Sequence, residues 1–446
     1  MTSQPSLNGS YRQPRERLRR SLIATLMLGA VLVGAGSTAT NVVRAVESTS
    51  RYQPVTPIRI ADTRSGAAIA ANTTRDFKLT GSLIPETATA VVINVTATRS
   101  QGTGYVEVFP TGRATVGSSS TLNLDFAGQT IPNTSFAPLG DGGQVTVFTK
   151  FTTDVIIDVF GYFVPAESAT AGRLVPLTPT RILDTRNDIG YDSDRYGISV
   201  TAIYPDGRRD GGTTWIWNRV VRGQTVTLQV AGRGGVPTSG VSAVIMNVTV
   251  DAPSAPGFVQ VGPTPLIKGT HSNLNPEPGR TIANLVVVPL GNDGRVDLFS
   301  ELYAPGALDL IADVVGYFTD ATAPSSTAGL FVPLTPTRNV DTRQPAPQPK
   351  IASGGNVNID ASKIPNGASA IAGNLTSTGG GPGGYLQLLS MPASLGASSS
   401  LNTSYQGQTI ANAVVTPVAA GGNAQVHTYG STHILLDVTG WFTGDG

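Results

Sequence analysis

Cysteine is absent from the 446 residues, and histidine occurs only three times. Without cysteine the chain can form no disulfide, no thiol nucleophile and no cysteine-ligated zinc site. The histidines, His271, His427 and His433, have no metal-ligand spacing, although His427 and His433 could face one another across neighbouring strands. The sequence predicts no metal site and no other cofactor.

Charge is also scarce. Charged residues make up 13% of the chain, against roughly 25% in an average soluble protein. The formal net charge of the whole chain is +1. Residues 1–45 hold six arginines and one glutamate and so contribute +5, which leaves a net charge of −4 for the rest of the chain. A near-neutral, slightly acidic body lacks the basic surface that binds nucleic acid or anionic lipid. No serine-hydrolase elbow, zinc-protease or phosphate-loop signature occurs either.

Residues 1–45 read as a signal peptide. A basic stretch at residues 12–20 precedes an apolar run at residues 22–36, and small residues follow, with candidate cleavage sites after Ala39 and, preferred, after Ala45. The run is shorter than the roughly 20 residues that span a bilayer, which favours cleavage over an uncleaved anchor. Arg19 and Arg20 would suit twin-arginine export. We expect a secreted or cell-surface protein with no membrane association after cleavage.

What the chain has in abundance is glycine, 52 residues, and proline, 31, in a pattern that repeats three times. A motif Pro-x-Arg-x-x-Asp-Thr-Arg opens each copy, Asn-Val-Thr or Asn-Leu-Thr follows, and Asp-Val-x-Gly-aromatic-Phe closes it. The predicted repeats are residues 52–164 (repeat 1), 174–319 (repeat 2) and 331–443 (repeat 3). Short linkers rich in Ala, Ser and Thr suggest beads spaced along a line, with contacts between neighbours.

Each repeat contains about seven short apolar or alternating runs, with turns roughly every ten residues and no helical period. This pattern predicts an all-β protein of three tandem antiparallel β-sandwich, or barrel-like, domains. The densest run, residues 90–96, is typical of a strand that is covered on both faces.

The opening motif has two interpretations. The one we favour is architectural: Asp-Thr caps its own turn, and one arginine pairs with the carboxylate that opens the closing motif. The other is a ligand site built from the same side chains. The residues concerned are Arg59, Asp62, Arg64 and Asp158; Arg181, Asp184, Arg186 and Asp313; and Arg338, Asp341, Arg343 and Asp437.

The Asn-Val-Thr and Asn-Leu-Thr motifs, which begin at Asn94, Asn247 and Asn374, match the glycosylation sequon. Each lies in the most apolar run of its repeat, where a glycan has no room. We therefore expect buried asparagines that satisfy backbone groups.

Repeat 2 differs from the others by an insert. From the last motif arginine to the first aligned strand residue there are 13 positions in repeat 1 (64 to 77), 14 in repeat 3 (343 to 357) and 40 in repeat 2 (186 to 226). The insert, within residues 187–222, predicts a long β-hairpin. Its candidate ligand-binding residues are Trp215, Trp217, Tyr204, Tyr191, Asp192 and Asp194.

Two uses of the insert stay open. Its aromatic rings could stack on sugars or contact a protein, or they could cover the core of this repeat or a neighbour. The spacing of Asp188, Asp192 and Asp194 matches no EF-hand calcium loop. A catalytic site confined to one repeat should include an acidic residue that the other repeats lack. We expect only the insert to offer such residues.

The three recurring motifs resemble a tandem β-repeat of secreted proteins from high-GC Gram-positive bacteria. The likeness covers residues 52–442 apart from the insert, and it implies an extracellular accessory module with no known activity or binding residue to carry over. We expect an exported envelope or extracellular binding or structural protein that recognises polysaccharide or a protein partner through the repeat 2 insert. A secreted glycan hydrolase and a self-assembling surface protein are the alternatives, and the oligomeric state is left open.

Overall fold

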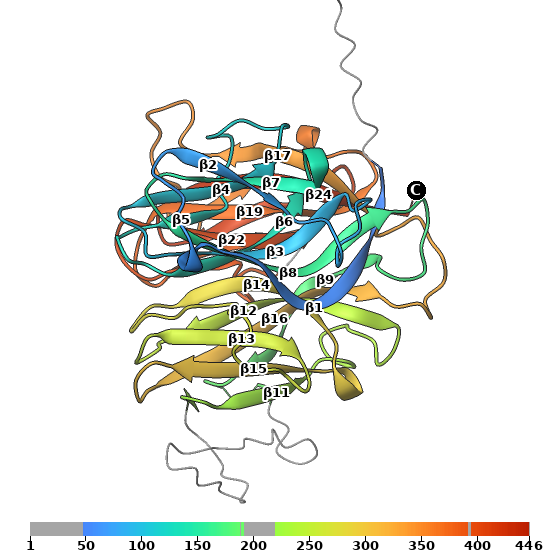
Figure 1. Ribbon diagram of the computed structural model, residues 1–446, viewed down its shortest axis with the longest axis horizontal. Helices are drawn as coiled ribbons and strands as arrows, with labels where there is room; N and C mark the ends of the chain where they lie inside the picture. The colour runs from blue at the N-terminus through green and yellow to red at the C-terminus, as the bar shows by residue number, and fades with distance from the viewer. Residues whose placement is uncertain (1–47, 188, 191–218, 391–393, 446) are drawn as a thin grey trace, which may run out of the picture. The chain divides into compact units, whose positions relative to one another are not determined.

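The computed structural model describes residues 48–187, 189–190, 219–390 and 394–445, which all belong to one compact unit, Val46–Gly446. Their regular structure is β-strand with four short 3-10 turns, so the all-β prediction is confirmed (Figure 1). No helix in this part of the chain is long and apolar enough to cross a membrane. The predicted signal peptide lies outside the described residues.

Repeat 1 folds into two antiparallel sheets that pack face to face. The inner sheet has the order β6-β3-β8-β1 and the outer sheet the order β2-β7-β4-β5. The strands are β1 (Ser50–Asp62), β2 (Thr73–Lys78), β3 (Ala90–Thr98), β4 (Gly104–Pro110), β5 (Leu122–Leu124), β6 (Ile131–Pro138), β7 (Gln144–Thr149) and β8 (Asp154–Pro165).

Repeat 2 repeats this plan, with an inner sheet of β14, β12, β16 and β9, to which the two-residue β10 adds by also pairing with β16, and an outer sheet of β11, β15 and β13. In Figure 1 the outer strands lie below the inner ones. The strands are β9 (Leu174–Asp184), β10 (Val220–Val221), β11 (Thr225–Gln229), β12 (Val241–Asp251), β13 (Gly257–Pro263), β14 (Ile282–Pro289), β15 (Arg295–Leu302) and β16 (Ala307–Thr319).

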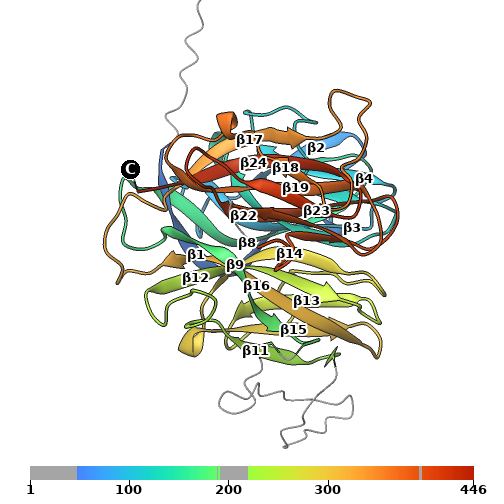
Figure 2. The same ribbon diagram turned by 180° about the vertical axis from the view of Figure 1, so that it is seen from behind.

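Repeat 3 matches repeat 1 strand for strand, with an inner order β22-β19-β24-β17 (Figure 2) and an outer order β18-β23-β20-β21. Its β17 meets β1 of repeat 1, which joins the two inner sheets into one of eight strands. The strands are β17 (Phe331–Asp341), β18 (Asn356–Asn358), β19 (Ala368–Gly380), β20 (Gly384–Leu389), β21 (Leu401–Thr403), β22 (Gln408–Pro417), β23 (Gln425–Tyr429) and β24 (His433–Thr443).

The central inner strands β3, β12 and β19 are buried on both faces over most of their length, as the dense apolar run of β3 predicts, whereas the first strand of each repeat is partly exposed. Successive side chains of a strand point to opposite faces. In β3, Val91 and Ile93 belong to the core between the two sheets, whereas Ala90 and Val92 belong to a second apolar cluster. Every residue of β3 is buried. Each repeat therefore has a sandwich core and a second apolar face that needs a partner.

That partner is the other two repeats. The second cluster takes side chains from all three, and the phenylalanines that end the closing motifs form a triangle: the ring centroids of Phe163, Phe318 and Phe442 lie 6.3 to 6.5 Å apart. Tyr52 stacks on Phe318 at 4.2 Å, and Phe331 packs on Phe163 at 4.4 Å. We call this second cluster the central aromatic core. The repeats surround a shared centre, which corrects the expectation of beads along a line.

A ring of asparagine contacts closes the same centre with approximate threefold symmetry. The second asparagine of one repeat donates from Nδ2 to the sequon asparagine of another. The three contacts are Asn284 to Asn94 at 3.0 Å, Asn412 to Asn247 at 2.8 Å and Asn133 to Asn374 at 2.8 Å. We call these six residues the asparagine ring.

Each ring member also satisfies backbone groups across the interfaces. Asn94 donates to the Ser272 carbonyl at 2.9 Å, and Asn284 accepts from the Thr134 amide at 3.1 Å. Buried amides are costly unless they are hydrogen-bonded, so these side chains fix how the repeats dock. The sequon asparagines are at most 8% exposed, and the interpretation as buried structural residues is supported by every contact they make.

The linkers are pinned to this centre as well. Gly172 accepts from the Tyr52 amide and donates to the Thr319 carbonyl, both at 2.8 Å, while Gly329 accepts from Leu174 at 2.8 Å. Both glycines have positive φ, and a Cβ on either would lie within 2.3 Å of a backbone oxygen. Only glycine fits such close approaches. The linkers therefore hold the repeats together rather than spacing them apart.

A polar cleft between repeats 2 and 3 as the candidate site

The structure brings the opening and closing motifs of each repeat together. The first motif arginine makes a bidentate ion pair with the carboxylate in the last strand. Arg59 Nε and Nη2 lie 2.8 and 3.1 Å from the Asp158 oxygens, and the same atoms of Arg181 lie 2.9 and 3.2 Å from those of Asp313. Arg338 and Asp437 pair in the same way. All three aspartates are 1% exposed. A carboxylate buried to this extent needs a bidentate partner of this kind.

The motif aspartate links the two arginines of each copy. Asp184 accepts from the backbone amide of Arg186 at 3.1 Å, which caps the turn, and from its guanidinium at 2.9 and 2.8 Å. Arg181 Nη1 reaches Asp184 from the other side at 3.2 Å. Asp62 and Asp341 hold equivalent positions between their own arginines.

The motif threonine clamps the last strand. The Thr185 hydroxyl donates to Asp309 at 3.0 Å and accepts from the Leu310 amide at 3.1 Å. Thr63 makes the same two contacts with Asp154 and Val155, at 2.8 and 2.9 Å. These contacts account for each polar residue of Asp-Thr-Arg without a ligand.

Burial raises the pKa of these carboxyl groups, whereas the neighbouring arginines lower it. Burial raises the pKa of Asp313 and Asp437 despite their arginines. For Asp184, burial also opposes ionisation, but hydrogen bonds and charge from Arg186 outweigh it and lower the pKa. Hydrogen bonding to Arg343 lowers the pKa of Asp341 to about 2. Each motif thus keeps its capping carboxylate ionised.

In repeat 2 the network of ion pairs between the motif arginines and aspartates includes one more residue, Asp251. Arg186 Nη1 donates to Asp251 Oδ2 at 3.0 Å, and the Thr281 hydroxyl donates to Asp251 Oδ1 at 2.5 Å. The strand register places Asp251 where repeats 1 and 3 have Thr98 and Thr378. The expectation that only the insert offers an acidic residue absent from the other repeats is therefore wrong.

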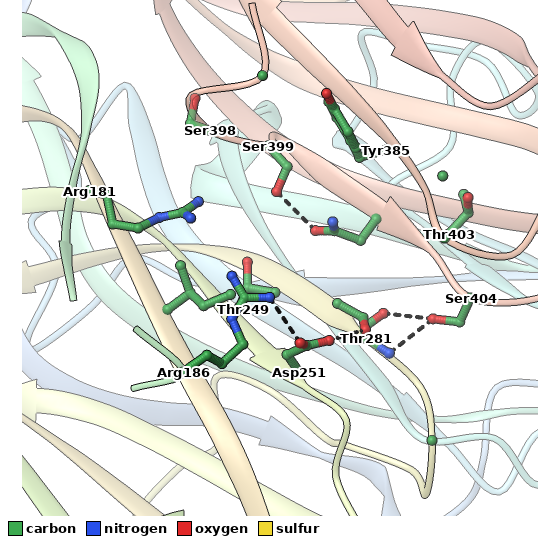
Figure 3. A pocket seen from close by; sticks show the side chains of 16 residues that line it. Arg181, Arg186, Thr249, Asp251, Thr281, Tyr385, Ser398, Ser399, Thr403 and Ser404 are labelled. Atoms are coloured by element: carbon green, nitrogen blue, oxygen red, sulfur yellow. Dashed lines mark hydrogen bonds and ion pairs between the residues drawn. The ribbon is translucent and has the colours of Figure 1, made fainter. Parts of the chain in front are cut away.

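Asp251 borders a cavity of about 420 Å³ between repeat 2 and the outer sheet of repeat 3. Figure 3 shows Arg181 and Arg186 on one side and Tyr385, Ser398 and Ser399 on the other. Along it, the Thr281 amide donates to Ser404 Oγ at 2.9 Å, and this hydroxyl donates back to the Thr281 carbonyl at 3.0 Å. The further lining residues are Thr249, Gly279, Ile311, Gly383, Gly384, Gly396, Asn402 and Thr403. We call this space the 2–3 cleft.

Two tyrosines form an aromatic platform at the cleft. Tyr385, which lines the cleft, stacks on Tyr429 with ring centroids 5.4 Å apart and an interplanar angle of 15°. Tyr429 is 56% exposed. Sequence reasoning missed this site because its two walls come from different repeats, and even their nearest lining residues, Ile311 and Gly383, are 72 positions apart in the chain. The available signal was Asp251, an aspartate at a position where the other two repeats have threonine.

The candidate binding residues of the insert, Trp215, Trp217, Tyr204, Tyr191, Asp192 and Asp194, lie outside the described residues. On its C-terminal side the described chain resumes at Arg219, whose Nε donates to Asp309 at 2.9 Å and whose Nη2 lies 3.5 Å from the Asp251 carbonyl. The predicted hairpin and its exposure stay predictions.

The histidines do not pair. His427 lies in outer strand β23 and hydrogen-bonds Asn356 at 2.9 Å, whereas His433 begins inner strand β24 and is paired with Thr378. The suggestion that they face one another across neighbouring strands is wrong. His271 packs edge-on against Phe160 of repeat 1 at 5.1 Å. Within the described ranges, no group of three histidine or acidic side chains could hold a metal ion.

Comparison with known proteins gives no family. No family model matches the chain, and no curated protein matches it. Among solved structures, a triple jelly roll protein of an archaeal virus has 10% identity over 89% of this chain and 90% of its own, with a TM-score of 0.18. A chain of the Sulfolobus turreted icosahedral virus has 10% identity over 89% and 92%, also with a TM-score of 0.18.

A third solved structure is the N-terminal CBM22-1–CBM22-2 tandem domain of Xyn10C from Paenibacillus barcinonensis. It has 12% identity over 60% of this chain and 99% of its own, with a TM-score of 0.19. At such TM-scores none of these likenesses carries an argument about what this chain binds.

Proposed function

We propose that this chain is an exported protein of the cell envelope or extracellular space that binds polysaccharide without cleaving it, through the 2–3 cleft. The observation that carries the proposal is a cavity lined by hydroxyls and paired guanidiniums, with the Tyr385 and Tyr429 platform at its edge. Sugar rings present apolar faces to aromatic side chains and hydroxyls to polar ones. Export is supported by the signal-like residues 1–45 and by the resemblance of the repeats to secreted modules.

The charges at the cleft favour binding over hydrolysis. A glycosidase needs one carboxylic acid that stays protonated near neutral pH and a second carboxylate across the scissile bond. The pKa of Asp184 is lowered, and Asp251 is held by Arg186 and Thr281. Both carboxylates are held in ion pairs on the same side of the cleft, and of the two only Asp251 lines it, where it can accept a hydrogen bond.

The test is binding of the mature chain to an array of bacterial envelope polysaccharides, with Tyr385→Ala as the cleft variant. We expect up to about a tenfold loss of affinity, because an aromatic stacking contact is worth about 0.5–1.5 kcal/mol and about 1.4 kcal/mol corresponds to a factor of ten. The matched control is Tyr105→Ala, the equivalent position of repeat 1, because both residues follow the first glycine of their outer strand. The control should bind normally.

Two further measurements distinguish this proposal from binding through the insert and from hydrolysis. Loss of binding in a Trp215→Ala, Trp217→Ala double variant with Tyr385→Ala unaffected would move the site to the insert. Release of reducing ends from a bound polysaccharide would indicate a hydrolase. Absence of binding to every polysaccharide on the array would overturn the proposal.

A further inference from the structure

The charged groups of the 2–3 cleft are already paired with one another. Every guanidinium nitrogen of Arg181 donates to Asp313 or Asp184, and every one of Arg186 donates to Asp184 or Asp251. Two arginines thus face three aspartates. Neither guanidinium offers an uncompensated positive charge to a ligand.

The rest of the lining is uncharged. Beyond Arg181, Arg186 and Asp251, the side chains around the cleft are serine, threonine, asparagine, tyrosine and one isoleucine, together with glycines. Asp251 is 24% exposed at its side chain, so its carboxylate can still accept a hydrogen bond from the cleft. Such a surface offers many neutral donors and acceptors around one negatively charged acceptor.

An anionic ligand would fit this surface poorly. Its charge would meet Asp251, and it could reach a guanidinium only by displacing a carboxylate already bound there, two of which are buried. A neutral hydroxyl needs no such exchange, because it can donate to Asp251 and accept from a serine or threonine. Hydroxyl groups that leave every ion pair intact are therefore the preferred ligand groups.

Comparison of the repeats points to the residue responsible. Thr98 hydrogen-bonds Thr130 at 2.7 Å, and Thr378 hydrogen-bonds Thr409 at 2.9 Å, whereas Asp251 contacts Thr281 and also Arg186. Repeats 1 and 3 fold with threonine at this position. The aspartate of repeat 2 is thus dispensable for the sandwich, while it adds a charged acceptor beside the cavity.

We propose that the 2–3 cleft selects uncharged saccharides over uronate- or phosphate-bearing ones, and that Asp251 is the specificity-determining residue. This inference rests on the proposed function and names the ligand class of the same site. Binding depends on hydrogen bonds and ring stacking, so its affinity is insensitive to salt.

The experiment measures affinities of the mature chain for neutral hexasaccharides of glucose, mannose, galactose and arabinose, and for hexagalacturonate and a glycerol phosphate hexamer. Each is measured in 50 mM and 500 mM NaCl. We expect the tightest ligand to be neutral, with an affinity that changes less than twofold between the two salt concentrations, because exposed charges alone respond strongly to screening. Asp251→Thr, which reproduces the other repeats, should weaken it about tenfold.

The control is Asp141→Asn, a change of charge at a side chain of repeat 1 that is 75% exposed. It should leave every affinity unchanged. Tightest binding to an anionic hexasaccharide, with a tenfold fall at high salt, would overturn this inference and leave the proposed function standing. So would full affinity for neutral ligands in Asp251→Thr. Absence of binding to all six probes, or full binding by Tyr385→Ala, would instead remove the proposed function.

Discussion

The centre of this protein and the 2–3 cleft use the same repeat in opposite ways. At the centre, equivalent residues of the three repeats make equivalent contacts, as the triangle of Phe163, Phe318 and Phe442 shows. At the cleft, one repeat departs from the other two by replacing threonine with Asp251. The buried triangle and the asparagine ring tolerate little change, because a smaller or apolar residue in one copy would leave a cavity or an unpaired amide. Partial exposure leaves the residues at the cleft free to diverge.

The largest effect should come from the central aromatic core. Phe163→Ala removes a ring that contacts side chains of all three repeats, and we expect a loss of about 3–5 kcal/mol in the free energy of unfolding. Denaturant unfolding of the mature chain measures it. Tyr303→Ala, at a side chain that is 65% exposed, is the control and should cost less than about 0.5 kcal/mol. Similar values for both would contradict a shared core.

The asparagine ring should rank next. Asn284→Leu removes the contacts to Asn94, to the Asn273 carbonyl and to the Thr134 amide, and it leaves buried partners unsatisfied. We expect a loss of about 3 kcal/mol, measured by the same unfolding assay. The control is Asn292→Leu, at an exposed position of the same repeat, which should be nearly neutral.

A double-mutant cycle tests whether the ring acts between repeats. Asn94→Ala and Asn284→Ala should together cost less than the sum of the single changes, with a coupling energy of about 1 kcal/mol. Additive losses would mean that the two side chains stabilise their own repeats independently.

Much of the fold could be predicted from local sequence. Glycine-punctuated runs of alternating residues report strands and turns directly, and the dense run that contains Asn94 correctly indicated a strand buried on both faces. The pairing of Arg181 with Asp313 could be predicted because a buried carboxylate is unfavourable unless a positively charged partner binds it. These are properties of single repeats, which short-range patterns encode.

The arrangement of the repeats could not be predicted in the same way. The linkers look flexible by composition, and nothing local reveals that Gly172 and Gly329 are held against Tyr52 and Leu174. The role of Asp251 was hidden for the same reason. Its neighbours across the cleft, such as Ser404, come from another repeat. Contacts that depend on docking appear only once the repeats are placed.

The arginine fork should contribute less than the centre and respond to pH. Arg338→Met leaves the buried Asp437 without its partner. Because the Arg338 side chain is itself 26% exposed, we expect a loss of about 2–3 kcal/mol at pH 7, below the roughly 3–5 kcal/mol of a fully buried pair. Burial already raises the pKa of Asp437, and removing the arginine raises it further. A carboxyl group with a raised folded-state pKa takes up a proton as the pH falls, so the deficit of the variant should shrink in acid.

Unfolding between pH 4 and pH 8 measures that dependence. The control is Arg113→Met, whose pair with Asp141 is 3.8 Å long and more than half exposed on both sides. It should cost less than about 0.5 kcal/mol at every pH. A deficit of Arg338→Met that stays constant from pH 8 to pH 4 would contradict an uncompensated carboxylate.

The motif cap should give the smallest effect, and its cost should also shrink in acid, but only at a lower pH because the pKa of Asp341 is lowered. Hydrogen bonding to Arg343 lowers the pKa of Asp341 to about 2, below its ordinary value of 3.8. A lowered folded-state pKa contributes stability above the ordinary pKa, and that contribution is lost as the pH falls from about 4 to about 2. Asp341→Asn should therefore cost at most about 2 kcal/mol at pH 7 and almost nothing near pH 2. The exposed Asp445→Asn is the control, and a cost of Asp341→Asn that persists at pH 2 would assign the effect to lost packing instead of the ion pair.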